Sequence, residues 1–245
     1  IDQDMKNNLS YRLYGRTKGR KKKHNNLFSK IKLKKLDEEV DYIIDIGAGY
    51  GVFLDEWRKA NPDSECLAVE PSKLLADECR AKGLDVQQCS AEELSGFDQY
   101  ADIVVCFEVL EHVHNPLSFI NTLSKFIKPG GWLFLSTLCI DGFDLSILGE
   151  HSAQISPPHH INFLSVDGFE QLFERAGLIS TDITTPGKLD VDIVRNFIKS
   201  NPGQIKRDKF IDSILNDDKK ANAFQLFLAD NQLSSHVWVL GKIQK

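Results

Sequence analysis

Short apolar runs alternate with amphipathic segments along most of the chain. The runs fall at residues 42–46, 66–70, 85–89, 102–107, 131–138, 178–184 and 236–243. Each run has the length of a strand, and helical patterns of about 10–15 residues separate most of them. Neighbouring parallel strands need helical crossovers of this kind, because the chain must return before the next strand begins. The pattern therefore predicts an α/β fold with a doubly wound sheet that helices cover on both faces.

Local signals mark the boundaries of four helices. One helix carries the apolar face Phe53, Leu54 and Trp57. Each of the other three follows a residue that can cap its first turn and ends at a glycine or a Pro-Gly pair. We therefore expect the third helix to include Ile127 and to stop before Pro129. The capping and terminating residues are Ser72 with Gly83, Asn115 with Pro129-Gly130-Gly131, and Ser165 with Gly177.

Two segments fall outside this alternation. Residues 1–36 hold 12 Lys/Arg and 2 Asp/Glu, a net charge of +10, whereas the remainder holds 18 and 33, a net charge of −15. Such an arm either binds nucleic acid or a phosphorylated substrate, or is simply solvated. Residues 188–230 carry two or three helical patterns before the last run, which is typical of a lid. The predicted domains are a basic arm (1–36), a main domain (37–187 and 231–245) and a helical insertion (188–230).

Composition narrows the class of protein. The chain has 245 residues, of which 42% are hydrophobic, enough to bury one sizeable core. Its five cysteines are scattered and include no C-x-x-C pair, so we expect neither a disulfide framework nor a zinc site built from cysteines. No apolar stretch reaches the ~18 residues that a membrane helix needs. We therefore expect a cytoplasmic protein that does not insert into membranes.

A glycine-rich turn follows the first apolar run. The sequence D-I-G-A-G-Y-G occupies Asp45–Gly51, just before an amphipathic segment. Glycine lets the backbone turn tightly and approach a ligand because it has no Cβ, and the start of the next helix offers N–H groups to that ligand. The next apolar run ends in Glu70, whose carboxylate can accept hydrogen bonds from ribose hydroxyls. Together the turn and the acid predict a nucleoside-binding site.

Four features, in order along residues 40–245, resemble class I S-adenosylmethionine (SAM) methyltransferases. The turn has G-x-G-x-G spacing, and Glu70 stands where this family has its ribose-binding acid. The segment C-F-E-V-L-E-H-V at Cys106–Val113 is similar to the ubiquinone-biosynthesis O-methyltransferase branch, and Lys128-Pro-Gly-Gly131 resembles the lead into the fifth strand. The resemblance implies a seven-stranded, mostly parallel Rossmann-like sheet whose last strand, 236–243, runs antiparallel. It also implies that the helical insertion precedes that strand, close to the acceptor pocket.

The same resemblance implies how SAM is bound. Asp45 would bind the ammonium group, directly or through water, and Glu70 would accept both ribose hydroxyls. The two residues between Ser90 and Glu93 would contact adenine, although Ser90-x-x-Glu93 is also a capping box. As purely structural alternatives, Asp45 is a solvated acid at a strand end and Glu70 a charge at a helix start. The predicted cofactor residues are Asp45, Gly47, Ala48, Gly49, Glu70, Pro71, Ser90, Ala91, Glu92, Phe107 and Glu108.

Glu108-x-x-Glu111-His112 is the most informative polar cluster. Its offsets bring two carboxylates and an imidazole to one side of a helical turn, and such groups bind hard or borderline divalent ions. In the O-methyltransferase branch that the chain resembles, and in small-RNA 2′-O-methyltransferases, a later histidine joins a similar motif to hold a metal. The resemblance therefore implies a divalent metal such as Mg²⁺ at Glu108, Glu111, His112 and His160. In the alternative, the carboxylates are solvated and His112 is hydrogen-bonded to a loop.

The histidines are also candidate catalytic bases. An alcohol oxygen is a weak nucleophile until it loses its proton, so O-methylation requires a base. Imidazole titrates near neutral pH. We expect His112 or His160 in this role ahead of His159, which stands beside them in the Pro157–Phe163 segment.

The predicted function is SAM-dependent methyl transfer to a small-molecule acceptor, such as a hydroxyl of a sugar or nucleotide sugar. Thr185–Asp192 resembles methyltransferases found among surface-polysaccharide enzymes, and Arg16, Arg20 and Lys22 would then hold the acceptor's diphosphate. Three alternatives stay open: an RNA 2′-O-methyltransferase, an NAD-dependent oxidoreductase, and a non-catalytic SAM-binding module. The acidic body speaks against nucleic acid, and the G-x-G-x-G spacing speaks against NAD.

Overall fold

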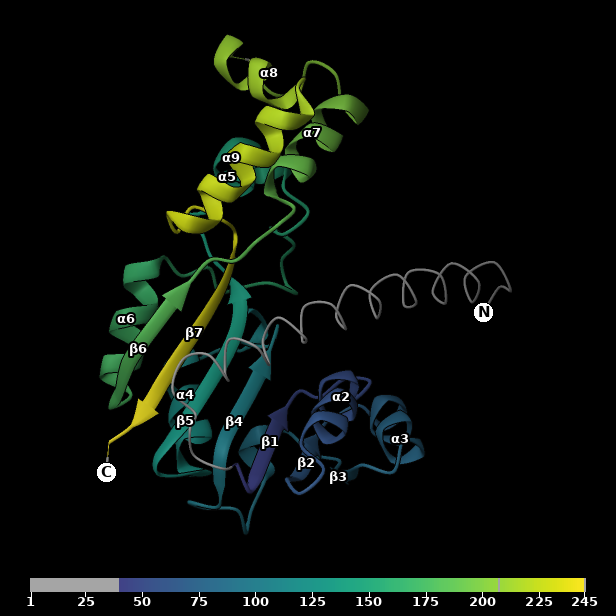
Figure 1. The fold of residues 1–245 in the computed structure, drawn as a ribbon, viewed down its shortest axis with the longest axis vertical. Helices are drawn as coiled ribbons and strands as arrows, with labels where there is room; N and C mark the ends of the chain where they lie inside the picture. Colours follow the sequence, from purple (N-terminus) through teal and green to yellow (C-terminus); the bar gives the residue numbers. More distant parts are fainter. Residues whose placement is uncertain (1–39, 207, 245) are drawn as a thin grey trace. The chain divides into compact units, whose positions relative to one another are not determined.

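A computed structural model describes residues 40–206 and 208–244 (Figure 1). Seven strands form one sheet in the order β3-β2-β1-β4-β5-β7-β6. β1 is parallel to β2 and β2 to β3, whereas β7 is antiparallel to both β5 and β6. The predicted α/β sheet with an antiparallel last strand is confirmed. The strands are β1 (Tyr42–Ile46), β2 (Glu65–Val69), β3 (Asp85–Gln87), β4 (Ala101–Phe107), β5 (Ile127–Leu138), β6 (Leu178–Thr184) and β7 (His236–Ile243).

Helices or 3-10 turns lie between successive strands up to β6, and three helices precede β7. This confirms the predicted helical insertion before the last strand. Within the described residues, none of the helices is both long enough and apolar enough to cross a bilayer. The predicted basic arm lies outside the described residues. The helices are α2 (Val52–Ala60), α3 (Lys73–Ala81), α4 (Pro116–Lys125), α5 (Phe143–Leu148), α6 (Val166–Arg175), α7 (Asp190–Ser200), α8 (Lys209–Leu215) and α9 (Asp218–Asp230), with short 3-10 turns η1 (Ala91–Glu93), η2 (Leu110–His112) and η3 (Gly149–His151).

One predicted boundary is wrong. α4 ends at Lys125, and Ile127 belongs to β5 instead of extending the helix. The carbonyl of Phe126 accepts hydrogen bonds from the backbone N–H groups of Tyr100 and Ala101 at 2.9 Å, so the chain is already paired beside the start of β4. A Cβ at Gly131 would lie 2.8 Å from the carbonyl oxygen of Asp102. The Pro-Gly-Gly sequence therefore permits close strand approach and does not terminate a helix.

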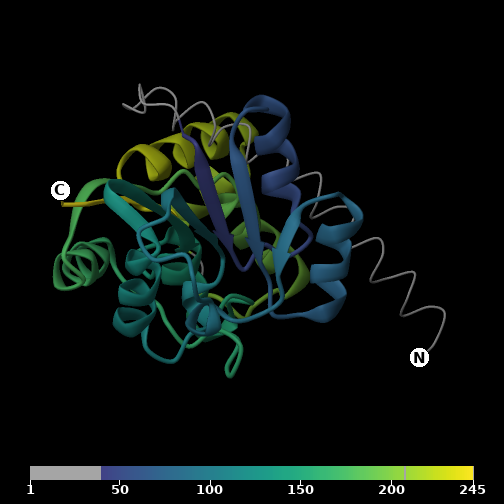
Figure 2. The same cartoon turned by 90° about the horizontal axis from the view of Figure 1, so that it is seen from below.

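Contacts divide the chain into two compact units. Of the described residues, the first comprises those up to Val105 together with Lys125–Gly131. Its core contains the buried residues of β1 and the face of α2 that carries Phe53, Leu54 and Trp57, as the sequence predicts. Figure 2 shows α2 and α3, both in blue, beside the strands of this unit.

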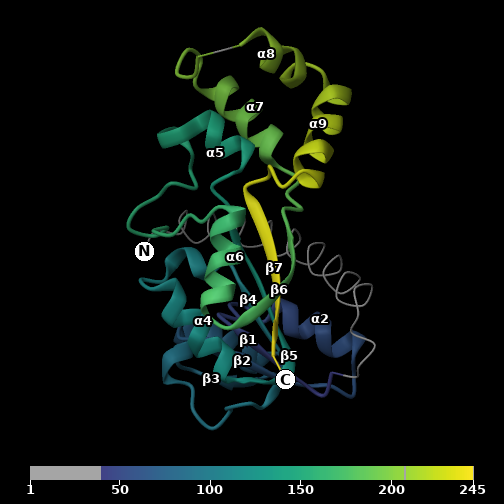
Figure 3. The ribbon, with the colours of Figure 1, turned by 90° about the vertical axis from the view of Figure 1, so that its left-hand side faces the viewer.

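The second unit comprises Cys106–Ser124 and the chain from Trp132 onward. In it, α6 packs beside β6, and four helices gather beyond the ends of β6 and β7 (Figure 3). These four helices, α5, α7, α8 and α9, surround a core of their own. That core consists of Leu148, Val191, Val194, Leu215, Ala221 and Leu228.

Candidate active site

The turn between β1 and α2 is bound to the end of β2. The backbone N–H groups of Gly47 and Ala48 both donate to the carbonyl of Val69, at 2.9 and 3.1 Å. Gly47, Gly49 and Gly51 have φ angles of 72°, 58° and 63°, in the left-handed region that residues with a Cβ rarely adopt. The glycines are therefore required by the backbone path, whatever the turn binds.

Glu70 connects this turn to the segment after β2. Its side chain is buried, with 5% of the residue exposed. Oε2 accepts a hydrogen bond from the Gly49 N–H at 2.8 Å, and Oε1 accepts one from the Ser72 N–H at 2.9 Å. A carboxylate has about four lone-pair positions, so each oxygen can accept a further hydrogen bond. The carboxylate is thus fixed in place and still able to bind two hydroxyl groups.

The other predicted cofactor residues of the first unit lie on the neighbouring strand ends. Asp45 is 1% exposed at the carboxyl end of β1, and Ala91 is 5% exposed in η1, the turn after β3. Ser90 and Glu93 form the predicted capping box, in which the Ser90 N–H donates to Glu93 Oε2 at 2.9 Å. The hydrogen bonds from Ser90 hold the pKa of Glu93 below its usual range. Ser90 therefore has a structural role that the sequence left open.

In the second unit, the loop after η3 is held against η2. The N–H groups of Ile161 and Asn162 donate to the carbonyl of Glu111, at 2.8 and 3.2 Å. The Asn162 side-chain amide donates to the carbonyls of Leu110, at 3.2 Å, and of Val113. These bonds place the histidines of the loop beside Glu111, although about 50 residues separate them in the sequence.

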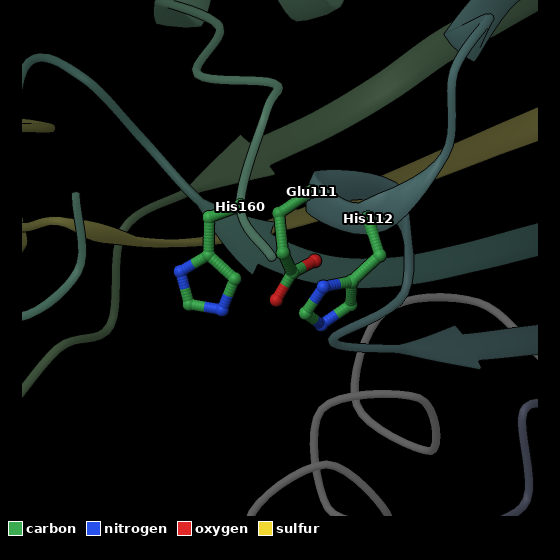
Figure 4. A group of neighbouring side chains, drawn as sticks. All are labelled: Glu111, His112 and His160. Atoms are coloured by element: carbon green, nitrogen blue, oxygen red, sulfur yellow. The ribbon is translucent and has the colours of Figure 1, made fainter. Parts of the chain in front are cut away.

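Glu111, His112 and His160 form a compact donor group (Figure 4). One donor atom from each lies within 4.8 Å of the others. Thr137 Oγ1 donates to Glu111 Oε2 at 2.7 Å, and Glu111 is only 2% exposed. Burial, followed by the nearby charge of Glu108, raises the pKa of Glu111. A positive ion or a proton donor beside this carboxylate would offset the cost of burying its charge.

Backbone carbonyls orient both imidazoles. His112 Nδ1 lies 2.6 Å from the carbonyl oxygen of His159, and His160 Nδ1 lies 2.7 Å from that of Gln154. A carbonyl can only accept, so Nδ1 carries the hydrogen in each ring. In the neutral form, each Nε2 then presents a lone pair, ready to take a proton or to bind a metal. His159 contributes its carbonyl to this arrangement, and its side chain is not part of the donor group.

Glu108 lies near the donor group but is not a member of it, although the sequence predicts it as a metal ligand. It has a φ of 57°, uncommon for a residue with a side chain, immediately after β4. Its Oε1 accepts a hydrogen bond from Ser136 Oγ at 2.7 Å and lies 3.6 Å from His236 Nδ1. The geometry therefore reduces the four predicted ligands to three among the described residues.

His236 is a site residue that sequence reasoning missed. Trp238 Nε1 donates to His236 Nε2 at 2.9 Å. An indole can only donate, so His236 Nε2 is the acceptor and its Nδ1–H is directed to the Glu108 side. The signal was hidden because His236 begins an apolar run. Only the antiparallel register, which pairs Leu138 with His236 and Ser136 with Trp238, brings it to Glu108.

The sheet order, the glycine turn and the acid after β2 define the chain as a class I SAM-dependent methyltransferase. A family model described as a methyltransferase domain matches residues 17–180, which is more than half of the chain. The chain belongs to this methyltransferase family, and the predicted family resemblance is confirmed. SAM is accordingly its methyl donor.

Curated relatives include O-methyltransferases of ubiquinone biosynthesis. The protein of Methylococcus capsulatus is 31% identical over 176 residues, which cover 63% of this chain and 73% of the relative. That of Albidiferax ferrireducens is 33% identical over 115 residues, covering 44% and 46%. The chain thus spans less than half of the second relative's length. Both proteins are named for ubiquinone biosynthesis, and this chain is distantly similar to them.

Solved structures support the fold. A methyltransferase from Haloferax volcanii, determined in complex with the Trm112 methyltransferase activator, superposes with a TM-score of 0.64 at 17% identity. The superposition covers 94% of this chain and 95% of that one. At this level of identity the similarity establishes the fold alone.

Proposed function

We propose that this enzyme transfers the methyl group of SAM to a hydroxyl of a small molecule, and that sugars and nucleotide sugars are the first class to test. The observation that carries the proposal is the pair of imidazoles, His112 and His160, whose Nδ1 atoms are bonded to carbonyls. Both Nε2 atoms are therefore available as bases. The names of the two O-methyltransferase relatives point to the same acceptor atom.

Oxygen acceptors explain why such a base is present. SAM is already activated for methyl transfer, because its sulfonium leaves as a neutral thioether. The enzyme therefore has only to provide a nucleophile that is held in line with the methyl carbon. As the acceptor oxygen forms its bond to the methyl carbon, the carbon–sulfur bond breaks and S-adenosylhomocysteine is released. The hydroxyl proton passes to Nε2 of His112 or His160. An amine acceptor would need only to be neutral and would not call for this arrangement.

For the donor, we propose the residues of the first unit. Glu70 accepts the two ribose hydroxyls with the lone pairs that its bonds to Gly49 and Ser72 leave available. The glycine turn (Gly47, Ala48, Gly49) and Asp45 bind the methionine part, and Ala91 with Glu92 contacts adenine. Pro71 and Ser90 complete the proposed set in this unit. Phe107 and Glu108, which the sequence also predicts as cofactor residues, belong to the second unit. Glu108 has a left-handed backbone conformation, and its carboxylate lies beside Ser136 and His236. These two residues would hold the carboxylate in a fixed orientation.

As an alternative to the base role, we propose that Glu111, His112 and His160 bind a divalent metal, in which case the Nε2 lone pairs would go to the ion and not to the hydroxyl proton. The residues fit such an ion, because two imidazoles and one carboxylate form a common donor set for borderline metals such as Mn²⁺, Fe²⁺ or Zn²⁺. Mg²⁺ prefers oxygen donors and fits less well. A bound cation would lower the pKa of an acceptor hydroxyl. Thr137 and the two carbonyls hold the three side chains in place for it.

The proposal is tested by methyl transfer from labelled SAM to a panel of sugars, nucleotide sugars, phenols and amines. We expect product with hydroxylated compounds only, and a loss of roughly 100-fold or more in kcat for His160→Gln, since general bases contribute about that much. His114→Gln is the matched control, because His114 is outside the donor group. Transfer to amines alone, or equal rates in His160→Gln, His112→Gln and the wild type, would contradict O-methylation by this site.

The metal is tested separately. Isothermal titration of chelator-treated protein with Mn²⁺ and with Zn²⁺ should give one site per chain, and His112→Gln should weaken it at least tenfold. Undetectable binding of both ions would reject the metal and leave the histidines as bases.

A further inference from the structure

Several segments connect the strands of the second unit to α5 and to the three helices of the insertion, α7, α8 and α9. Three segments, 139–144, 185–190 and 231–236, contribute residues to a buried polar cluster. Burying polar groups away from solvent costs free energy unless the groups form hydrogen bonds with one another. The cluster consists of Thr185 (0% exposed), Asp144 (0%), Ser234 (0%), Asp190 (2%) and Ser235 (6%).

Asp190 is the centre of this cluster, and both of its carboxylate oxygens accept hydrogen bonds. Its Oδ1 accepts from the Ser235 N–H at 2.7 Å, and its Oδ2 accepts from Gln225 Nε2 at 2.7 Å. The hydroxyl of Ser234 lies 2.9 and 2.7 Å from the two oxygens. Asp190 begins α7, Gln225 lies on α9, and the two serines lead into β7. One carboxylate thus ties three parts of the chain together.

The segments meet too closely to admit an ion or a further side chain. A Cβ at Gly187 would lie 1.7 Å from Ser234 Oγ and 2.8 Å from Asp190 Oδ2. A Cβ at Gly142 would lie 2.3 Å from the Cα of Ser235. A solvated cation requires more space than a methyl group, so it cannot compensate charge where these segments touch.

Asp144, in the first turn of α5, faces the same cluster. Neither of its carboxylate oxygens accepts a hydrogen bond of normal distance and angle, and the residue is 0% exposed. Burial is the main reason that the pKa of Asp144 rises to about 6; Ser235 opposes this, and the charge of Asp190 adds to it. As a carboxylic acid, Asp144 gains an O–H that Asp190 can accept. Two close carboxylates that cannot both be ionised characteristically share one proton in this way.

The described residues around Asp144 and Asp190 provide no positive charge that would balance two carboxylates. Among the described residues, no Lys, Arg or His lies within ion-pair distance of Asp144 or Asp190. α9 contributes the uncharged Gln225, and the segment before β7 contributes two serines. The titratable neighbours in sequence are directed elsewhere: Lys188 is exposed, Asp192 lies 3.6 Å from Arg195 Nη1, and Asp141 accepts from the Val166 N–H at 2.8 Å. His236 faces Glu108 and Trp238. The proton is therefore the positive charge available to the pair.

We propose that Asp144 and Asp190 share one proton and so form a latch that fastens α5 to α7 and to the segment leading into β7. When the shared proton leaves to solvent, two negative charges face each other without water, and the three connecting segments loosen. The insertion is therefore held more firmly on the acid side of neutrality. The latch is independent of the methyl acceptor and of any metal.

The sign of the effect follows from linkage. The closed state holds the proton up to a pH of about 6, whereas an opened, hydrated Asp144 would hold it only to its ordinary pKa of 3.8. Between these values the closed state binds more protons, so opening becomes easier as pH rises, and the effect levels off above the folded pKa. With these two values, the opening equilibrium increases about tenfold between about pH 5 and about pH 7.5.

Hydrogen–deuterium exchange of the full chain tests the latch. After correction for intrinsic exchange rates, amides of residues 185–191 and 233–237 should lose protection about tenfold from about pH 5 to about pH 7.5. In Asp144→Asn, whose amide donates to Asp190 at every pH, protection should not change with pH. Asp192→Asn is the matched control on α7, where Asp192 is 57% exposed, and it should keep the wild-type dependence.

Two results would overturn the latch: wild-type protection that is constant over this range, or an Asp144→Asn variant with the wild-type pH dependence. Carbon-13 NMR of the wild-type carboxyl groups gives a decision even if Asp144→Asn does not fold. The Asp144 carboxyl should titrate above about pH 5, and a midpoint below about pH 4 would exclude a shared proton.

Discussion

Replacing Glu70 tests two roles of its carboxylate: the hydrogen bonds that it accepts from the Gly49 and Ser72 N–H groups, and the proposed binding of the ribose hydroxyls. In Glu70→Ala, the backbone N–H groups of Gly49 and Ser72 lose their acceptor, and the proposed ribose hydroxyls lose theirs. Stranding hydrogen-bonded polar partners costs about 1–3 kcal/mol, so we expect the dissociation constant of S-adenosylhomocysteine to rise roughly 5- to 150-fold. The free energy of unfolding should fall by a similar ~1–3 kcal/mol, because the N–H groups are left unpaired in the apo protein as well.

Glu70→Gln sharpens the test because it conserves shape. A glutamine retains one oxygen, so its amide N–H₂ must face either Gly49 or Ser72, a donor opposite a donor. We therefore expect Gln to recover only part of the affinity that Ala loses. Glu65→Ala is the matched control, since Glu65 is exposed at the start of the same strand.

The assay is isothermal titration with S-adenosylhomocysteine, which needs no knowledge of the acceptor, together with urea unfolding of each apo variant. Affinity in Glu70→Ala within twofold of the wild type, in a protein that still unfolds cooperatively, would refute the ribose role. Equal losses in Glu65→Ala would show that the effect is not specific to the buried carboxylate.

Three further predictions concern stability and are read by chemical denaturation. Asp102→Ala removes the acceptor of the Asp41 and Tyr42 N–H groups, at 3.0 and 2.8 Å, and should lower the free energy of unfolding by about 1–3 kcal/mol. Lys128→Met breaks only the half-exposed ion pair with Asp102 and should lower it by under about 1 kcal/mol. Equal losses in the two variants would contradict the explanation by backbone hydrogen bonds. Gly241→Ala places a Cβ 2.5 Å from Phe173 Cδ1 in the core and should cost about 1–3 kcal/mol; an unchanged midpoint would show that the ring moves away freely. Thr137→Val should cost about 1–3 kcal/mol by leaving the buried Glu111 without its hydroxyl donor, and Thr137→Ser should restore most of that; failure of the serine to do so would point to packing instead.

The strands were predictable because hydrophobic periodicity reports burial directly. What failed depends on contacts that are distant in sequence. α4 stops at Lys125 because the next carbonyl is already paired with Tyr100 and Ala101, and no local signal reveals this pairing. α5 was not predicted, since its six residues are too short for a periodic pattern and pack against the later helices of the insertion.

The residues of the candidate site also fall into those that local sequence spacing could predict and those that depend on distant contacts. The E-x-x-E-H spacing and the nearby histidines indicated the donor group, and the structure brings Glu111, His112 and His160 together. Spacing alone could not separate Glu108 from them, because a single left-handed residue at the end of β4 changes where its side chain lies. Nor could it find His236, whose proximity to Glu108 depends on strand register.

The shared core of the insertion limits how this enzyme can be shortened or recombined. Leu148 of α5 belongs to the same core as Val191 and Leu228, although α6 and β6 lie between α5 and α7 in the sequence. Excising residues 188–230 alone would expose the apolar side of α5 to water, and exposed apolar surface promotes aggregation. Exchanging this helical insertion for that of another enzyme should therefore succeed only when α5 is transplanted along with the three later helices, because the four helices share one core.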